Sequence, residues 1–201
     1  MRVVVRTIAA LGIVAVWSVP PAYAEQPNRS GFSTGFGLGG ASVSWTWPDD
    51  ERRREESAAG NARFAWALKQ DVLVGLELWG WTKDYEIGSV PEDVPAQTSV
   101  WAATVAATYF PGNAGFFMRG GIGVGRGRAE VTPPPSVVGF PVSGTESDTG
   151  LSVLGAMGYE AGLTPHLSLG GAAHVVYVGI DAAPFDDVFG YGLTVQFNWY
   201  W

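Results

Sequence analysis

The sequence predicts an all-β fold, an eight-stranded antiparallel up-and-down β-barrel that crosses a membrane. Hydrophobic residues make up 47% of the chain and charged residues only 15%, against roughly 25% charged residues in an ordinary soluble domain. Beyond the N-terminal region, no uninterrupted apolar run reaches the ~20 residues of a membrane-spanning helix. The apolar side chains instead recur at every second position, which is typical of a strand with one face toward lipid.

The N-terminal region has the features of a secretory signal peptide. Arg2 and Arg6 precede an apolar stretch at 7–19, and the Ala-Tyr-Ala sequence at 22–24 fits a cleavage site. An uncleaved membrane anchor is the alternative, but the apolar stretch is short for a spanning helix. We therefore expect a signal peptide at 1–24 and a barrel domain at 25–201.

The C-terminal stretch shows the alternation most clearly. Between Phe189 and Trp201 the odd-numbered residues are aromatic or aliphatic, whereas the even-numbered ones are Gly, Thr, Gln and Asn, with Tyr200 the bulky exception. The same alternation predicts six earlier strands near 61–69, 72–78, 100–110, 116–125, 151–160 and 167–177.

The first strand, at 31–47, is less regular. Its apolar residues are even-numbered up to Leu38 and odd-numbered from Val43 to Trp47. A β-bulge near Gly39 and Gly40 would explain this change, since an inserted residue reverses the facing of every residue after it.

The connections between these strands alternate in length. Short turns are expected at 69–71, 111–114 and 164–166, and long polar loops at 48–60, 83–99 and 131–150, with a shorter loop at 181–187. Short turns on one side and long loops on the other are typical of outer-membrane barrels, with the short turns in the periplasm.

With these features, residues 31–201 resemble the small eight-stranded outer-membrane barrels, of the OmpA transmembrane-domain and OmpX type, grouped as the outer membrane protein beta-barrel domain. The resemblance rests on the signal peptide, the strand count, the loop alternation and the C-terminal aromatic residue. It implies a location in the outer membrane of a Gram-negative bacterium. It also implies that Trp201, where Phe is more usual, is the signal read by the barrel-insertion machinery.

The inward face is predicted to hold a polar network. A turn centred on Gln70 would place Arg63 opposite Glu77, and Lys69 opposite Asp71, with all four side chains inside. Arg119 and Glu160 fall near the same ends of neighbouring strands. We expect the interior to be a structural plug of paired charges, with an open ion path as the alternative. The expected members of this network are Arg63, Lys69, Glu77, Arg119, Glu160, His174 and Gln196.

The outward aromatic residues are expected to form two girdles at the membrane interfaces. Trp101 and Tyr109 are eight residues apart on one face, which is roughly 26 Å along a strand and about 20 Å after tilting. The inward face, by contrast, is expected to carry small or polar residues. The predicted interface aromatics are Trp66, Trp101, Tyr109, Tyr159, Tyr177, Trp199 and Trp201.

Catalytic residue types are scarce. The chain has no cysteine and two histidines, so no metal site, no cofactor and no catalytic activity are expected. The sequence His166-Leu167-Ser168 resembles the His-x-Ser sequence of the lipid A deacylase barrels, but Ser168 is predicted to face inward, away from lipid. We expect a structural or surface-interaction protein. The alternatives are a narrow pore or lateral conduit for small or hydrophobic solutes, and a lipid A-modifying acyl hydrolase.

The charge distribution indicates which partners to expect. A net charge of -7 disfavours nucleic acid. Acidic loop residues beside lipopolysaccharide phosphates would need bridging Ca²⁺ or Mg²⁺, whereas Arg126 and Arg128 could contact phosphates directly. The expected partners are outer-membrane lipid and lipopolysaccharide, the barrel-insertion machinery and an extracellular ligand at the loops. The protein itself is expected to be a monomer.

Overall fold

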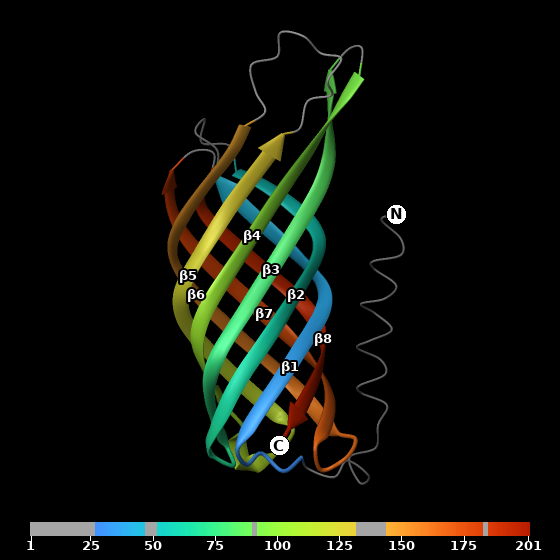
Figure 1. Cartoon of the computed structure of the whole chain (residues 1–201), viewed down its shortest axis with the longest axis vertical. Helices are drawn as coiled ribbons and strands as arrows, with labels where there is room; N and C mark the ends of the chain where they lie inside the picture. The colour runs from blue at the N-terminus through green and yellow to red at the C-terminus, as the bar shows by residue number, and fades with distance from the viewer. Residues whose placement is uncertain (1–26, 47–51, 90–91, 132–143, 183–184) are drawn as a thin grey trace.

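The chain folds into a closed antiparallel barrel in which strands β1 to β8 are neighbours in sequence order and β8 pairs with β1 (Figure 1). This computed structural model describes residues 27–46, 52–89, 92–131, 144–182 and 185–201. The predicted eight-stranded barrel is confirmed, while the predicted signal peptide at 1–24 lies outside the described residues. The strands are β1 (Phe32–Thr46), β2 (Arg52–Lys69), β3 (Val72–Ser89), β4 (Glu92–Tyr109), β5 (Phe116–Val131), β6 (Gly144–Gly162), β7 (Leu167–Ala182) and β8 (Phe185–Tyr200).

Short turns join the strands at one end of the barrel, which we call the turn end. A 3-10 helix, η1 (Pro111–Asn113), joins β4 to β5 there, and the C-terminus lies at the same end (Figure 1). We call the opposite end the loop end. Within the described ranges, no helix is both long and apolar enough to cross a membrane.

The period-two pattern of the sequence appears as an apolar outer wall. Leu193 and Phe197 of β8 are 44% and 40% exposed, while Thr194 and Gln196 between them are buried inside. Large exposed hydrophobic residues occur on the outward face of every strand. Such a surface suits hydrocarbon, because a soluble protein seldom leaves so large an apolar area in water.

The register of strand β1 differs from the prediction. Its register with β2 runs without interruption from Phe32 to Thr46, so the bulge expected at Gly39 and Gly40 is wrong. The register shift of β1 lies elsewhere, against β8 beyond Ser44. Val43 and Trp45 therefore keep the inward facing of the odd-numbered residues and are buried. The apolar face changes along β1 because the inside of the barrel becomes apolar toward the loop end.

The strands extend further than the alternation predicted. Strand β2 begins at Arg52, β3 and β4 pair up to Ser89 and Glu92, and β6 begins at Gly144. The loops expected at 48–60, 83–99, 131–150 and 181–187 are therefore partly strand. The ladder of backbone hydrogen bonds does not depend on side-chain polarity, so β2 continues through the charged segment 52–56, where the hydrophobic alternation is lost.

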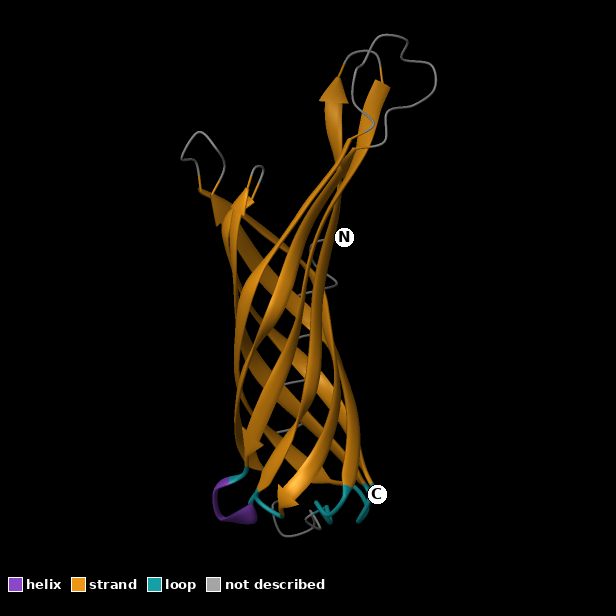
Figure 2. Cartoon of the chain, turned by 60° about the vertical axis from the view of Figure 1, so that its left-hand side comes forward, coloured by secondary structure: helices purple, strands orange, loops and turns teal. Residues whose placement is uncertain are grey.

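The wall divides at the loop end. Pairing between β2 and β3 ends at Ala59 and Trp81, and pairing between β6 and β7 ends at Leu151 and Gly179. Beyond these points β3–β6 continue as a sheet that rises above the β7–β8–β1–β2 side (Figure 2). Lys83 spans the division between β2 and β3, donating a 3.1 Å hydrogen bond to the carbonyl of Glu56.

Candidate functional site

Glu77 is the centre of the polar interior. Arg119 on β5 donates from Nη1 to both carboxylate oxygens of Glu77, at 2.9 and 2.8 Å, and from Nε to Thr108 Oγ1 at 3.0 Å. Asn61 Nδ2 donates to Glu77 Oε1 at 3.1 Å. All four residues are buried. Glu77 on β3 is therefore paired across β4 with Arg119.

Arg63 lies opposite Glu77 in the ladder, as the turn geometry predicted. Its guanidinium nevertheless reaches the other way, across β1, and donates from Nη2 to Asn198 Oδ1 at 2.8 Å. Gly35 on β1 makes this possible, because a Cβ there would lie 2.3 Å from Asn198 Oδ1. Arg63 Nε and Nη1 have no hydrogen-bond partner in the described part of the chain.

Glu160 is held by Arg29, which precedes β1. Arg29 donates to Glu160 Oε1 from Nε at 3.1 Å and from Nη2 at 3.0 Å. It also reaches Asn113 Oδ1 at 3.0 Å and the carbonyl of Ala114 at 3.1 Å, and its guanidinium lies 3.7 Å from the ring centre of Phe110. Arg29 was not predicted from the sequence, because no alternation marks the segment before β1.

Arg119 and Glu160, expected near each other, each take another partner. The ladder sets Arg119 opposite Ala156 of β6, which leaves Glu160 nearer the turn end. Tyr200 donates its hydroxyl to Glu160 Oε1 at 2.7 Å, and Asn198 Nδ2 donates to Oε2 at 2.8 Å. We call the buried group that fills the turn end the basal plug; its members are Arg29, Phe110, Phe117, Glu160 and Tyr200.

His174 and Gln196 lie in the interior beside Glu77. His174 Nε2 is 2.8 Å from Thr194 Oγ1 and 3.1 Å from Gln196 Nε2, and its Nδ1 is 4.0 Å from Glu77 Oε1. All of these residues are buried. We call this buried group the polar layer; its members are Asn61, Arg63, Glu77, Arg119, His174, Thr194 and Gln196.

Lys69, also expected inside, is exposed at the turn end. The register between β2 and β3 shifts after Ala67, so Lys69 pairs with Val72 instead of Asp71. The interior placement of Lys69 is therefore wrong. The register shift removes this residue from the alternation that the rest of β2 follows.

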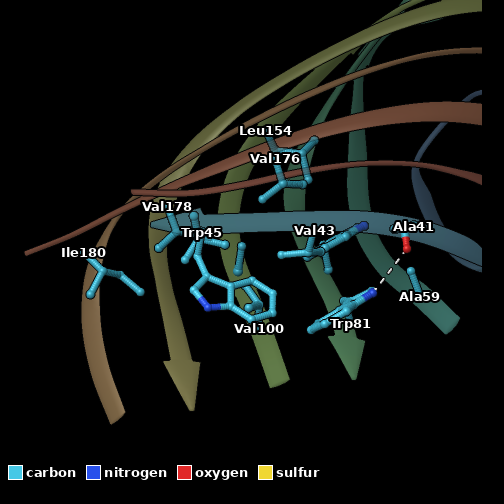
Figure 3. Packing of buried hydrophobic residues seen from close by; sticks show 13 residues of the cluster. Ala41, Val43, Trp45, Ala59, Trp81, Val100, Leu154, Val176, Val178 and Ile180 are labelled. Carbon is cyan, nitrogen blue, oxygen red and sulfur yellow. Dashed lines mark hydrogen bonds between the residues drawn. The ribbon is translucent and has the colours of Figure 1, made fainter. Parts of the chain in front are cut away.

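The interior toward the loop end is apolar, contrary to the prediction of small or polar residues. The rings of Trp45 and Trp81 meet edge to face with centroids 6.2 Å apart, and Trp81 Nε1 donates to the carbonyl of Ala41 at 3.3 Å (Figure 3). A Cβ on Gly125 would lie 2.6 Å from Val178 Cγ1, so the packing is close. We call this group the apolar lumen cluster; it comprises Ala41, Val43, Trp45, Ala59, Trp79, Trp81, Val100, Ala102, Leu154, Val176, Val178, Ile180 and Val188.

The seven predicted interface aromatics all lie exposed on the outer wall. Trp101 and Tyr177 are toward the loop end. Trp201, at the turn end, donates its backbone N–H to the carbonyl of Phe32 at 3.0 Å, and the two rings are 5.3 Å apart. The last residue thus contacts the start of β1. The others near the turn end are Trp66, Tyr109, Tyr159 and Trp199.

Arginines follow the apolar outer wall at the loop end. On β5 the outward Ile122 and Val124 are followed by Arg126 and Arg128. Arg126 lies opposite the outward Trp101 of β4 and donates to Ser147 Oγ. Arg128 forms an exposed ion pair with Glu130 at 2.8 Å.

A second basic group lies on β2. Arg54 donates to Ser42 Oγ at 2.7 Å, and its guanidinium is 5.0 Å from the ring centre of the outward Tyr191. Arg52 donates to Ser44 Oγ at 3.4 Å. Cationic groups therefore stand beside outward aromatic residues on two separate sectors of the barrel.

The candidate acyl-transfer residues do not form a catalytic pair. His166 lies in the turn before β7, with Nδ1 2.9 Å from the carbonyl oxygen of Tyr200. Ser168 is completely buried and accepts a 3.3 Å hydrogen bond from Asn198. No group of three or more potential metal ligands occurs among the residues that the structure describes.

No protein-family model matches the sequence, and no curated protein matches it either. Solved structures match the fold. Neisserial surface protein A has a TM-score of 0.56 at 14% identity, over 86% of this chain and 98% of that one. Ail of Yersinia pestis, in complex with the heparin analogue sucrose octasulfate, has a TM-score of 0.55 at 15% identity, over 85% and 98%. OprG, an outer membrane protein of Pseudomonas aeruginosa, has a TM-score of 0.52 at 14% identity, over 87% and 97%.

The closed barrel, its apolar outer wall and the similar solved structures all indicate the same architecture. Eight strands close without an edge, and the exposed hydrophobic residues face outward on every strand. The chain has the fold of the small eight-stranded outer-membrane β-barrels.

Proposed function

We propose that this protein is a non-catalytic barrel of the Gram-negative outer membrane that acts through its outer surface, by contacting lipopolysaccharide and an extracellular ligand. The observation that carries the proposal is the pair of arginine groups, on β2 and β5, at the loop-end border of the apolar wall. Guanidinium groups bind phosphate with charge-assisted hydrogen bonds. The phosphates of lipid A would lie at this level of the membrane.

The filled interior supports a role for the outer surface. Toward the turn end, the basal plug and the Glu77–Arg119 pair occupy the lumen, and toward the loop end the apolar lumen cluster does so. A continuous path for ions or solutes would have to pass both of these groups of buried side chains. The narrow-pore alternative is therefore less well supported than surface binding.

The extracellular part of the proposal rests on the tall sheet of β3–β6. Its backbone pairing continues beyond the division of the wall, so this part of the sheet would extend outside the membrane (Figure 2). The neighbour Ail was solved with a sulfated heparin analogue. We extend this chemistry to the present chain as a hypothesis: sulfate or phosphate groups on a sugar would suit Arg126 and Arg128.

Lipopolysaccharide binding by the purified barrel tests the first part. Arg54→Gln and Arg126→Gln should each weaken binding about tenfold in low-salt detergent micelles, the effect of losing ~1.4 kcal/mol of charge-assisted hydrogen bonding. Lys69→Gln removes one exposed positive charge at the turn end and is the matched control. Equal binding by all four proteins would contradict the proposal.

A divalent-cation chelator distinguishes lipopolysaccharide binding by the arginines from binding by the acidic loop residues through bridging cations. Binding that depends on the arginines should persist in EDTA, whereas binding through bridging Ca²⁺ or Mg²⁺ should be lost. Complete loss in EDTA would assign lipopolysaccharide contact to the acidic residues instead.

Shortening the β3–β4 hairpin tests the extracellular part. Replacing residues 84–97 with a two-residue turn removes most of this hairpin beyond the wall division but keeps the barrel pairs from Thr82 and Ser99 downward. Attachment of barrel-bearing cells to a heparin-coated surface should fall, while heat-modifiable migration of the barrel on gels should stay. Unchanged attachment would remove this hairpin from the proposal.

The enzyme alternative has a direct test of its own. The buried Ser168 and the separate His166 give no support to acyl transfer. Incubation with lipid A should therefore release no fatty acid. Release that is lost in Ser168→Ala would overturn the non-catalytic proposal.

A further inference from the structure

The buried interior contains one more positive than negative side chain. Among the described residues, the carboxylates of Glu77 and Glu160 are buried with the guanidinium groups of Arg29, Arg63 and Arg119, none of which is more than 5% exposed. His174 is neutral in this count, since its Nε2 lies 3.1 Å from the amide nitrogen of Gln196, which is a donor.

Both carboxylates already have strong partners. Glu77 receives two hydrogen bonds from Arg119, and Glu160 receives two from Arg29. Arg63 is left with the neutral Asn198 as its hydrogen-bond partner. Its Nε and Nη1 have no partner among the described residues, and neither does Nη2 of Arg119.

A buried guanidinium without a counter-charge is unfavourable, because desolvation removes the water that stabilises it. Water could satisfy the free N–H groups but would leave the charge uncompensated. A bound anion supplies both hydrogen-bond acceptors and the missing negative charge.

The surroundings limit the size of this anion. The polar layer lies between the apolar lumen cluster on the loop side and the basal plug on the turn side. The interior of an eight-stranded barrel is just wide enough for its own side chains. The space therefore favours a single small ion over a metabolite that carries a carboxylate or phosphate.

We propose that the barrel interior binds one small monovalent anion of the halide class, such as chloride, at the free N–H groups of Arg63. Nη2 of Arg119, which is also buried without a partner among the described residues, is a candidate second donor. This site is internal and is independent of the proposed lipopolysaccharide contacts on the outer wall.

Bromide provides the direct test. Crystals of the whole barrel grown in bromide should show one anomalous peak within hydrogen-bond distance of the Arg63 guanidinium. The unfolding midpoint in detergent micelles should also rise as bromide or chloride replaces gluconate at constant ionic strength, because an ion that binds only the folded state stabilises it.

Arg63→Gln removes the excess charge, and its shorter side chain also gives up the hydrogen bond from Nη2 to Asn198. This variant should lose the anomalous peak, and its midpoint should no longer depend on halide. Lys69→Gln, which removes an exposed charge from the same strand, should retain both properties of the parent.

Three outcomes would overturn the proposal. They are an ordered water instead of an anomalous peak, a peak without any halide dependence of the midpoint, and equal halide dependence in the parent and Arg63→Gln. The bromide measurement on the parent decides the matter even if the variant fails to fold.

Discussion

Arg29 joins the segment before β1 to the opposite wall of the barrel. Its guanidinium is buried against Glu160 of β6, Asn113 of η1 and the ring of Phe110. Each of its three nitrogens has a hydrogen-bond acceptor. Arg29 therefore has the pairing that Arg63 lacks, and it completes the basal plug.

Replacing Arg29 tests this role. Arg29→Met should lower the free energy of unfolding by about 3–5 kcal/mol, because Glu160 remains buried without its cationic partner. The measurement is urea unfolding in micelles, followed by tryptophan fluorescence. The exposed Arg52→Met should change stability by less than about 0.5 kcal/mol. Adding Glu160→Gln to Arg29→Met should recover much of the loss, and a small loss in the single variant would contradict the assignment.

Two glycines of the neighbouring strands β5 and β6 test whether the lumen is packed. Gly125 faces the apolar lumen cluster, where a Cβ would lie 2.6 Å from Val178, whereas a Cβ on the outward Gly155 would meet nothing within 4 Å. Gly125→Ala should cost about 1–3 kcal/mol by overpacking. Gly155→Ala should be neutral or slightly stabilising in the same unfolding assay. Equal stability of the two variants would indicate free space beside Gly125.

At the scale of the elements, the seam between β1 and β8 decides whether the barrel closes. The two strands pair from Ser33 and Tyr200 to Thr46 and Asp186, and the backbone of Trp201 adds a bond to Phe32. A hydrophobic last residue is thus part of the closure and of the apolar wall. That Trp201 is also read by the barrel-insertion machinery stays a prediction, which the following variant tests.

Trp201→Ser should separate recognition from stability. We expect a several-fold lower yield of heat-modifiable barrel in cells, but normal refolding of the purified protein into micelles. Trp66→Ser removes an exposed tryptophan at the same end of the wall and should not lower the cellular yield to the same degree. Equal losses in both variants, in cells and in refolding, would reduce Trp201 to an ordinary interface residue.

Across the whole molecule, side chains fill the lumen at two levels by different physical means, and we expect each level to block ions. The basal plug and the polar layer are held by ion pairs, whereas the apolar lumen cluster consists of buried apolar side chains packed against one another. A single substitution at either level leaves the other level closed.

Planar bilayers test this double closure. The parent, Trp81→Ala and Arg29→Met should each show no steady conductance proportional to salt, because each keeps one closed level. The combined variant should show a small steady current. Steady conductance of the parent would contradict the closed lumen and favour the pore alternative.

Much of the architecture could be predicted from residues that face lipid. The alternation of Phe197 and Trp199 with Gln196 and Asn198 fixes which side of β8 is outward, and hydrocarbon tolerates no other arrangement. The short turn at Gln70 fixes the register that sets Arg63 opposite Glu77. The strand number, the outward face of most strands and the opposition of Arg63 and Glu77 are local consequences of the chain and were correctly predicted, whereas the opposition of Lys69 and Asp71 was not.

The inner face was less predictable. The alternation shows that a residue faces inward or outward only where one face is polar, so it does not distinguish an inward apolar residue from a change of register. Val43 and Trp45 looked like a change of register, although they are the start of the apolar lumen cluster. Lys69 was predicted to face inward, but a register shift at the end of β2 places it on the outside.

The amino-acid sequence was enough to predict the barrel, its outward face and the inward position of Arg63, Glu77, Arg119 and Glu160. The tertiary structure alone decided the pairing of those charges: Glu77 with Arg119, Glu160 with Arg29, and Arg63 with no carboxylate. Ladder neighbours are set by turns of a few residues, whereas contacts across a lumen depend on the tilt and stagger of strands that are distant in the chain.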